Sequence, residues 1–400
     1  MSNLIQHNTY ELDTPFLRQL RYEGRLAFEQ LGLPRAKDEA WKYTRLRDLQ
    51  VDDYELPQVS SGSQSKVPFD CYEINISNGR VIGNIPLIKN ASIKKLSEAE
   101  QYIGKNIKTI SNGFIALNNY YLDNGIFIEI YKDIDKPIVL NYHMLPEGKN
   151  YLCNIRNIIV CQSNSHAKII EQYSYEGDVK SRYLHNIVNE IFVEQDACLE
   201  HYKYQNEAFK ANHIAFNGVR VVSNGAYKSF CLQKGANIAR NETQVNLDGE
   251  NAQTDINVAY MMNGWATIDT TTNVFHNFPY TNSQQLVKGV VGGEAKGVFQ
   301  GKIHIAPNAI GTNGTQLHKA VLLSDSAEVD VKPELEIFAD DVKCSHGAAC
   351  GELDKEQLFY MQARGIGLDE AKQILIDAYL NDVIDKIDDT DLKDWFKNLI

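Results

Sequence analysis

Three side chains that can bind a soft metal lie close together near the carboxyl end of the chain. Cys344, His346 and Cys350 fall within the segment ADDVKCSHGAACGELD. Thiolate sulfur and imidazole nitrogen are the ligands that iron, zinc and iron–sulfur clusters prefer, and Gly347 allows the backbone to turn between them. Three donors leave a coordination position for a residue from elsewhere. The segment is therefore a candidate metal or cluster site.

The spacing of these residues, C-x-H-x3-C, is not that of a zinc finger, which pairs two separate C-x2-4-C elements. The alternative interpretation is packed thiols beside a hydrogen-bonded histidine. Asp340 and Asp341 would then hold the histidine tautomer or cap a turn. The residues alone leave both interpretations open.

Other candidates for chemistry are weaker. The glycine-rich segment 289–297 lacks the pattern G-x4-G-K-S/T, and the sequence contains no G-x-S-x-G elbow. We therefore expect no nucleotide hydrolysis by this chain alone, so an ATP-driven step would need a partner. The remaining histidines and cysteines are scattered among predicted strands, and we interpret them as packed residues: His143, His166, His185, His201, His213, His276, His304, His318, Cys71, Cys153, Cys161, Cys198 and Cys231.

The segment that precedes the candidate site reads as strands and turns. From about 114 to 342, short alternating runs of Val, Ile, Tyr and Thr are separated by Asn, Gly, Asp and Ser. Several runs begin near an alanine, and four of the five intervals are close to thirty residues: Ala167, Ala197, Ala226, Ala266, Ala295 and Ala327. Such a repeat predicts a β-solenoid, although Ala236 and Ala252 disturb the period. An antiparallel sandwich or jelly roll is the alternative.

Helices are expected before the strands. Thr14 and Pro15 precede an apolar stripe that ends at Gly32, which predicts a capped helix. A short helical piece is expected over 39–49, a serine-rich linker over 57–66, and a hairpin turn at Asn78-Gly79.

Helices are also expected after the strands. Asp354 with Gln357 predicts a helix start, Gly365 a stop, and a final short helix carries Leu392 and Trp395. The helix expected over 369–387 has two apolar stripes, on different faces. One contains Ala371, Ile374 and Ala378, and the other contains Ile376, Leu380, Val383 and Ile387. The second stripe either packs within its own domain or docks a partner.

Composition limits the classes of partner. The formal net charge of −12 disfavours nucleic acid and anionic membranes, and no apolar run is long enough to cross a bilayer. The first residues, MSNLIQHNTYELD, do not resemble a secretory signal. Seven cysteines without an export signal favour reduced thiols, and hence the cytoplasm.

Two segments carry a resemblance to a known family. Pro333 to Ile366, PELEIFADDVKCSHGAACGELDKEQLFYMQARGI, resembles the signature of the SufB/SufD scaffold proteins of the SUF iron–sulfur cluster assembly system. Asp38 to Leu49, DEAWKYTRLRDL, resembles the amino-terminal region of the SufD branch. The resemblance implies a mainly β protein: a right-handed parallel β-helix core flanked by amino- and carboxyl-terminal α-helical regions. The expected boundaries are 1–65 (helical region and linker), 66–112 (mixed connecting segment), 113–347 (β-helix) and 348–400 (helical domain).

The resemblance also implies a function. Family members act as non-catalytic scaffolds in a complex of SufB, SufC and SufD of the bacterial cytoplasm, and the ATPase SufC docks on the carboxyl-terminal helices. This gives the stripe of Ile376, Leu380, Val383 and Ile387 a partner. His346, assisted by Cys344, is expected to offer a ligand to iron or a nascent cluster shared with SufB. Cys350 stands where relatives commonly have another residue, so its role as a ligand is open.

Other implications of the resemblance concern cofactors and partners. No permanently bound cofactor is expected, and reduced flavin is linked to the assembled complex in this family, although the sequence holds no flavin motif. A homodimer without SufB is one alternative. A carbohydrate-active β-helix enzyme is another, and it would need clustered acids along one solenoid face and usually an export signal.

Overall fold

The fold is seen in a computed structural model that describes residues 10–46, 49–57, 66–108, 112–146, 148–176 and 181–400. Strands hold 46% of the residues and helices 18%. Most of the predicted linker, 58–65, lies outside the described residues, as do 47–48 of the predicted second helical piece. No helix among the described residues is both long enough and apolar enough to span a membrane.

The chain begins and ends with helices, and the strands lie between them, with η3 and α2 inserted between the third and fourth strands. The helical elements are α1 (Pro15–Leu31), η1 (Glu39–Trp41), η2 (Val51–Asp53), η3 (Leu96–Ala99), α2 (Gly113–Tyr120), α3 (Lys355–Ala363), α4 (Leu368–Ile384) and α5 (Thr390–Lys397). The first strands are β1 (Tyr72–Ser77), β2 (Arg80–Ile82), β3 (Ala91–Lys95), β4 (Ile126–Ile130) and β5 (Ile138–Met144). The following strands are β6 (Tyr151–Cys161), β7 (His166–Tyr175), β8 (Tyr183–Val193), β9 (Cys198–Glu207), β10 (Ala211–Val221), β11 (Ala226–Gly235) and β12 (Ile238–Leu247). The last strands are β13 (Gln253–Met262), β14 (Thr267–His276), β15 (Asn282–Val291), β16 (Lys296–Ile305), β17 (Asn313–Leu322), β18 (Glu328–Ile337) and β19 (Lys343–Glu352).

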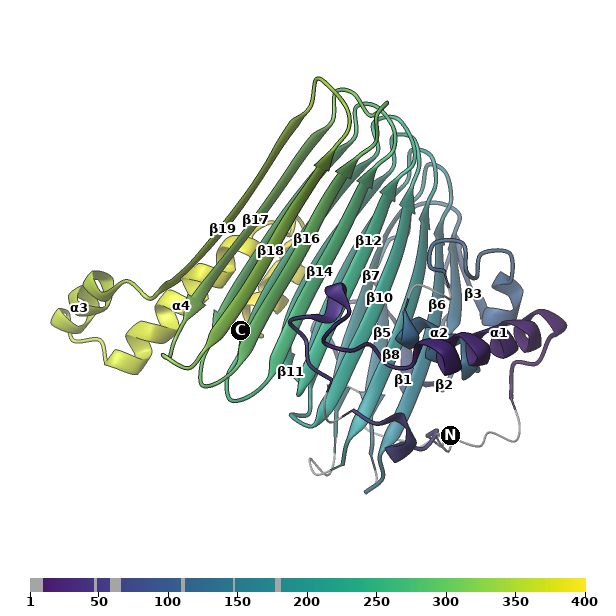
Figure 1. Cartoon of the computed structure of the whole chain (residues 1–400), viewed down its shortest axis with the longest axis horizontal. Helices are drawn as coiled ribbons and strands as arrows, with labels where there is room; N and C mark the ends of the chain where they lie inside the picture. Colours follow the sequence, from purple (N-terminus) through teal and green to yellow (C-terminus); the bar gives the residue numbers. More distant parts are fainter. Residues whose placement is uncertain (1–9, 47–48, 58–65, 109–111, 147, 177–180) are drawn as a thin grey trace.

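The strands wind into a β-solenoid of about eight turns (Figure 1). Within the described residues they form two sheets, ordered β19-β17-β15-β13-β11-β9-β7-β5-β1-β2 and β18-β16-β14-β12-β10-β8-β6-β4-β3. The pairs are parallel except at the first turn, where β2 and β3 pair antiparallel to β1 and β4. From β4 onwards, successive strands of the chain alternate between the two sheets, so each turn contributes one strand to each sheet. The solenoid interpretation is confirmed, and the sandwich alternative is wrong.

The alanine repeat has a structural cause. Ala167, Ala197 and Ala226 stand at or just before strands of the ten-stranded sheet, whereas Ala266, Ala295 and Ala327 precede strands of the other sheet. The irregular interval of 40 residues, from Ala226 to Ala266, arises because these two alanines belong to strands of different sheets. Ala252 and Ala236, which disturbed the period, precede β13 and β12 and continue the two series. The repeat is therefore real, and it consists of two interleaved series.

Strands in the middle of the solenoid, such as β6 and β8, bury both of their faces. The inward side chains form the largest apolar cluster, which runs along the solenoid between the two sheets. The outward face of the nine-stranded sheet is covered by the amino-terminal segments, where Trp41 packs on Phe114 with ring centroids 5.3 Å apart. Trp41 also covers the buried guanidinium of Arg240 at 4.2 Å, and Arg240 pairs with Asp269 at 2.5 Å. The segment 38–46 is thereby fixed to the sheet.

The outward face of the ten-stranded sheet is covered by α4 and α5. Phe396 of α5 lies 4.6 Å from Phe230 of β11, centroid to centroid. Lys288 of β15, largely buried, forms an ion pair with Asp382 of α4 at 2.5 Å. Lys168 of β7 forms a further ion pair with Asp389, which immediately precedes α5. The carboxyl-terminal helices are thus part of the solenoid's packing.

Several predicted caps and turns are confirmed. The side chain of Thr14 accepts a hydrogen bond from the Leu17 amide at the start of α1, and Gly32, with φ of 63°, ends that helix. Asn78 and Gly79 both have positive φ in the β1–β2 turn, and Asp354 caps α3. The piece expected over 39–49 differs, because among its described residues only Glu39–Trp41 forms a short helix, of the 3₁₀ type.

The elements do not stop at the expected boundaries. β1, within 66–112, pairs in parallel with β5 and so belongs to the same ladder as the later strands. At the other end, β19 continues to Glu352, beyond 347.

Candidate functional site

The three candidate metal ligands all lie on β19, the last strand of its sheet. β19 pairs in parallel with β17, which places Cys344 opposite Gly314 and His346 opposite Gln316. Cys344, His346 and Cys350 are separated by even numbers of residues, so their side chains leave the same face of the strand. This face is continuous with the inward face of β17, where His318 is stacked on Phe299 of the facing sheet. Because the described residues add no further turn, the face is open at β19.

Cys344 and His346 differ in exposure. His346 is exposed, whereas Cys344 is half-buried and packs near Ile303, Ile305 and Ala309. Burial raises the pKa of the Cys344 thiol, although a hydrogen bond from the Gly314 backbone opposes the effect. The thiol is therefore protonated until a metal or base displaces its proton.

Cys350 is displaced from the other two ligands. A strand rises about 3.3 Å per residue, so the Cα atoms of Cys344 and Cys350 are roughly 20 Å apart. One metal ion requires its ligand atoms within about 4 Å of one another, which excludes a common mononuclear site. The expectation that Gly347 would turn the backbone between these ligands is wrong, because 343–352 is a continuous strand. Cys344 and His346 are thus an incomplete ligand set.

The last turn of the solenoid has two open edges. β18 and β19, of 10 residues each, are paired on one side only within the described residues. An unpaired edge presents a row of N–H and C=O groups that can pair with another chain. Apolar side chains accompany these edges, because Phe338 is 61% exposed and Ile337 is 42% exposed at the end of β18.

The stripe of Ile376, Leu380, Val383 and Ile387 is buried inside the chain. These residues are between 0% and 6% exposed and contact the outward face of the ten-stranded sheet. The predicted docking stripe is therefore not accessible in this structure, because a partner would first have to displace α4 from the sheet. The alternative, a helix packed within its own domain, agrees with the contacts. In the first stripe, Ile374 and Ala378 are exposed, whereas Ala371 is buried.

The exposed apolar surface at this end of the chain is on α3. None of the side chains of α3 is buried, and Phe359 is 73% exposed and Tyr360 59% exposed. Leu368, at the start of α4, is 44% exposed. Figure 1 shows α3 projecting beyond the strands, so this surface is accessible to a partner.

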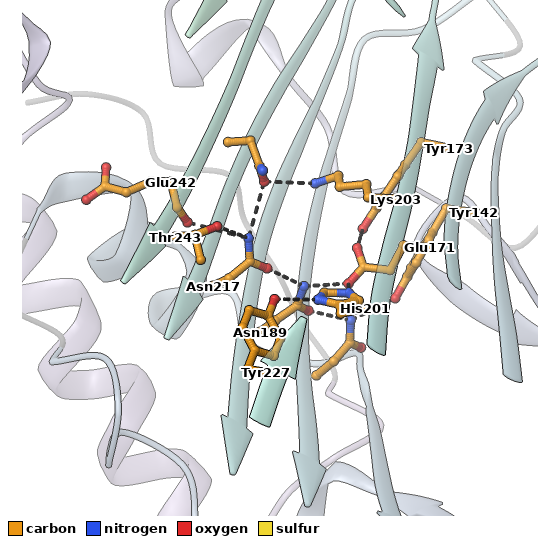
Figure 2. Close-up of polar contacts among 12 residues, drawn as sticks. Tyr142, Glu171, Tyr173, Asn189, His201, Lys203, Asn217, Tyr227, Glu242 and Thr243 are labelled. Atoms are coloured by element: carbon orange, nitrogen blue, oxygen red, sulfur yellow. Dashed lines mark hydrogen bonds and ion pairs between the residues drawn. The ribbon is translucent and has the colours of Figure 1, made fainter. Parts of the chain in front are cut away.

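A polar cluster that sequence reasoning missed lies inside the solenoid, between the two sheets (Figure 2). Glu171 accepts hydrogen bonds from Asn189 (2.6 Å), from Tyr173 (2.5 Å) and from His201 (2.9 Å). His201 also contacts the Tyr227 hydroxyl at 2.9 Å. Burial alone would raise the pKa of Glu171, but the hydrogen bond and charge of His201, with Lys203 and Tyr173, lower it to about 2.

A second interior cluster joins two histidines through one carboxylate. Oε1 of Glu207 lies 2.6 Å from Nδ1 of His185, and Oε2 lies 2.7 Å from Nδ1 of His213. All three side chains are almost completely buried. Burial lowers the pKa of His213 to about 4, so this ring is neutral at pH 7. Burial acts to raise the pKa of Glu207, but His213 and His185 hold it well below its usual range.

The spacing of the repeat could have revealed this cluster. His213 of β10 pairs directly with His185 of β8, so the two rings occupy the same position in successive turns. Their separation of 28 residues is one turn of the solenoid. A search for short metal motifs passes over such a pair, whereas a search at the period of the repeat would find it.

Comparisons with known proteins agree with this architecture. The family model of the SufBD core domain, SUF system FeS cluster assembly, matches residues 144–379. The iron–sulfur cluster assembly protein SufD of Escherichia coli is 30% identical over 379 residues, which cover 90% of this chain and 87% of that protein. An iron–sulfur cluster assembly SufBD family protein of Synechocystis is 27% identical over 384 residues, covering 89% and 84% of the two chains.

Proposed function

This chain belongs to the SufBD family of iron–sulfur cluster assembly proteins of the SUF system and is a homologue of SufD; from this premise we propose that it is a scaffold subunit without catalytic activity of its own. It pairs with a SufB-type chain through the last turn of its solenoid and binds a SufC-type ATPase through its carboxyl-terminal helices. The observation that carries the proposal is an open last turn with an exposed His346.

The difference between the two ends of the solenoid supports pairing through the last turn. At the first turn the edge strands are short and antiparallel, with 3 residues in β2 and 5 in β3. At the last turn the edges are β18 and β19, with 10 residues each. Proteins protect long exposed edges, because such edges recruit other chains. A second solenoid that continues the two sheets would satisfy these edges by strand addition.

His346 and Cys344 stand where the two chains would meet. An imidazole and a thiolate are ligands for iron or for a nascent cluster, which is the cargo of the assembly reaction. The partner would supply the remaining ligands, because within the described residues no third donor lies close enough to these two to complete a site. Cys350, about 20 Å along the strand from Cys344, takes no part in this set.

The ATPase would dock on α3 and on the exposed face of α4. Phe359 and Tyr360 of α3 are exposed apolar side chains, and so is Ile374 of α4. Contiguous exposed apolar surface is typical of protein interaction sites. A movement of α4 would displace the strands beneath it, because α4 packs on β13 and β15 of the sheet that ends in β19.

Two alternatives are distinguished by the partner. A homodimer joined through the last turn would use the same edges without a SufB-type chain, so the composition of the purified complex separates these two assemblies. Membership of the SufBD family favours the scaffold over the carbohydrate-active enzyme.

Substitution of His346 tests the proposed site. In cells that lack their own SufD, we expect His346→Ala to abolish most maturation of iron–sulfur enzymes while the complex still co-purifies. The matched control is Ser345→Ala, because Ser345 is exposed on the opposite face of β19. Maturation at the wild-type level by His346→Ala would overturn the proposed site.

A further inference from the structure

The interior cluster of His185, Glu207 and His213 has the composition of a metal site. The donor atoms of the three side chains lie within 4.8 Å of one another, and this is the only group of three such residues among those described. Two imidazoles and one carboxylate are a ligand set for zinc and for ferrous iron. A tetrahedral site needs its donors about 3.4 Å apart, so small side-chain rotations would bring all three onto one ion.

The fold itself holds these donors in place. His185 and His213 occupy paired positions of β8 and β10, which lie about 4.8 Å apart as neighbouring strands. Glu207 ends β9 on the facing sheet, so the carboxylate reaches the two rings from the other side of the interior. Tyr173 and Tyr183 pack edge-on against His213 and His185, at centroid distances of 4.7 and 5.4 Å. The rings are therefore fixed by packing.

The hydrogen bonding of the cluster is incomplete. His213 is 0% exposed, and neither of its ring nitrogens has a hydrogen-bond partner among the described residues; the contact with Glu207 is short but lacks hydrogen-bond geometry. Buried polar atoms without partners are rare and costly. Glu207 is buried with hydrogen bonds from His185 at 2.6 Å and from Gln205 at 3.3 Å, but it has no ion pair to any described lysine or arginine. A bound cation would give the His213 ring a partner and would balance the buried charge of Glu207.

We propose that His185, Glu207 and His213 bind one divalent first-row transition-metal ion, such as Zn²⁺ or Fe²⁺, inside the solenoid. This site is separate from that of His346. From β9 to β19 there are five strand spacings, or roughly 24 Å along the solenoid. The ion is structural, because closed surroundings leave no open face for a substrate. It therefore enters while the chain folds, before β11 and β12 cover the site.

The cluster around Glu171 and His201 supplies a matched control. It lies in the same interior and also joins a carboxylate to a histidine at 2.9 Å (Figure 2). It contains one histidine, and Tyr173, Asn189 and His201 already satisfy its carboxylate. We expect no metal there.

Metal content of the purified full-length chain tests the proposal. After dialysis against EDTA, wild-type protein should retain close to one equivalent of zinc or iron, and Cys344→Ala/His346→Ala should retain the same amount. Glu207→Gln should retain at least ten-fold less metal per chain than wild type, whereas Glu171→Gln should retain the wild-type amount. Equal retention by Glu207→Gln, or loss only in the Cys344→Ala/His346→Ala protein, would overturn the proposal.

A refolding measurement decides the question even where a variant does not fold. Wild-type chain, unfolded in denaturant with EDTA, is refolded with Co²⁺ or without metal. We expect uptake of one Co²⁺ with the visible absorption of a low-symmetry nitrogen and oxygen site, and a higher unfolding midpoint. Refolding to the same midpoint without cobalt uptake would show that the cluster is held by hydrogen bonds alone.

Discussion

Two histidines show how the origin of a residue's neighbours determines whether its role can be predicted from the sequence. His346 is exposed on the last strand, and a local motif with Cys344 was enough to single it out. His213 is fully buried, and its partners His185 and Glu207 come from other strands. Sequence reasoning interpreted His185 and His213 as packed residues, because short spacing was the signal that it searched for. Knowledge of the strand register is needed to see that they meet.

A third histidine, His318, should make the stability of the chain depend on pH. Its ring is buried, stacked on Phe299 at 5.1 Å, and Nε2 contacts the Tyr260 hydroxyl at 3.0 Å. Burial lowers the pKa of His318 to about 4. The unfolded chain therefore takes up this proton first, so the stabilising contribution is complete above about pH 6.5 and is lost as the pH falls towards 4.

This prediction can be measured by urea unfolding at pH 7 and pH 5. His318→Gln keeps a hydrogen-bonding group for Tyr260 but does not titrate. The loss of unfolding free energy between the two pH values should be smaller than in wild type by about 2 kcal/mol. Val219→Ala, which removes buried apolar volume in β10 without changing a titrating group or a neighbour of His318, should leave the pH dependence as in wild type. An unchanged dependence in His318→Gln would show that His318 is not the group responsible.

At the scale of elements, α4 shows the limit of helical periodicity. Residues of both predicted stripes lie on α4, except Ile387, which follows the end of the helix, but periodicity does not say which face meets the chain's own sheet. The stripe of Ile376 and Leu380 is the longer one, and it is buried on β13 and β15, which lie far from it in the sequence. The period of the solenoid, in contrast, was enough to predict the fold. Ala167 and its equivalents mark the start of strands, and this local signal recurs once in every turn.

Paired substitutions separate the buried and exposed faces of the carboxyl-terminal helices. Leu380 is 0% exposed, so Leu380→Asp places a charge in an apolar contact and should lower the thermal midpoint strongly or prevent folding. Phe359, which is 73% exposed, should tolerate Asp with an unchanged midpoint but with at least ten-fold weaker binding of the SufC-type ATPase. Circular dichroism and titration calorimetry measure the two effects.

The reverse pattern would contradict the proposed docking surface. If Leu380→Asp folded as wild type but lost the ATPase, the stripe of Ile376, Leu380, Val383 and Ile387 would be the docking site after all. Lys372→Ala, on the same helix as Leu380, serves as a control, because its half-buried side chain lies outside that stripe.

For the molecule as a whole, the asymmetry of the solenoid is the main finding. The fold class and the helical ends were predictable, because turn residues, caps and the thirty-residue repeat are written locally in the chain. The open last turn was not, because it depends on the number of turns and on where the terminal helices fold back. α4 and α5 cover a sheet face and leave the edges of β18 and β19 uncovered within the described residues.

Hydrogen exchange of the β19 amides tests the central claim most directly. The chain is compared alone and in a complex with the SufB-type and SufC-type proteins of the same cell. We expect exchange of the amides of Lys343–Glu352 to slow on complex formation, because the open edge becomes paired, while exchange in β10 stays unchanged. Equally fast exchange of the β19 amides within a stable complex would contradict pairing through the last turn.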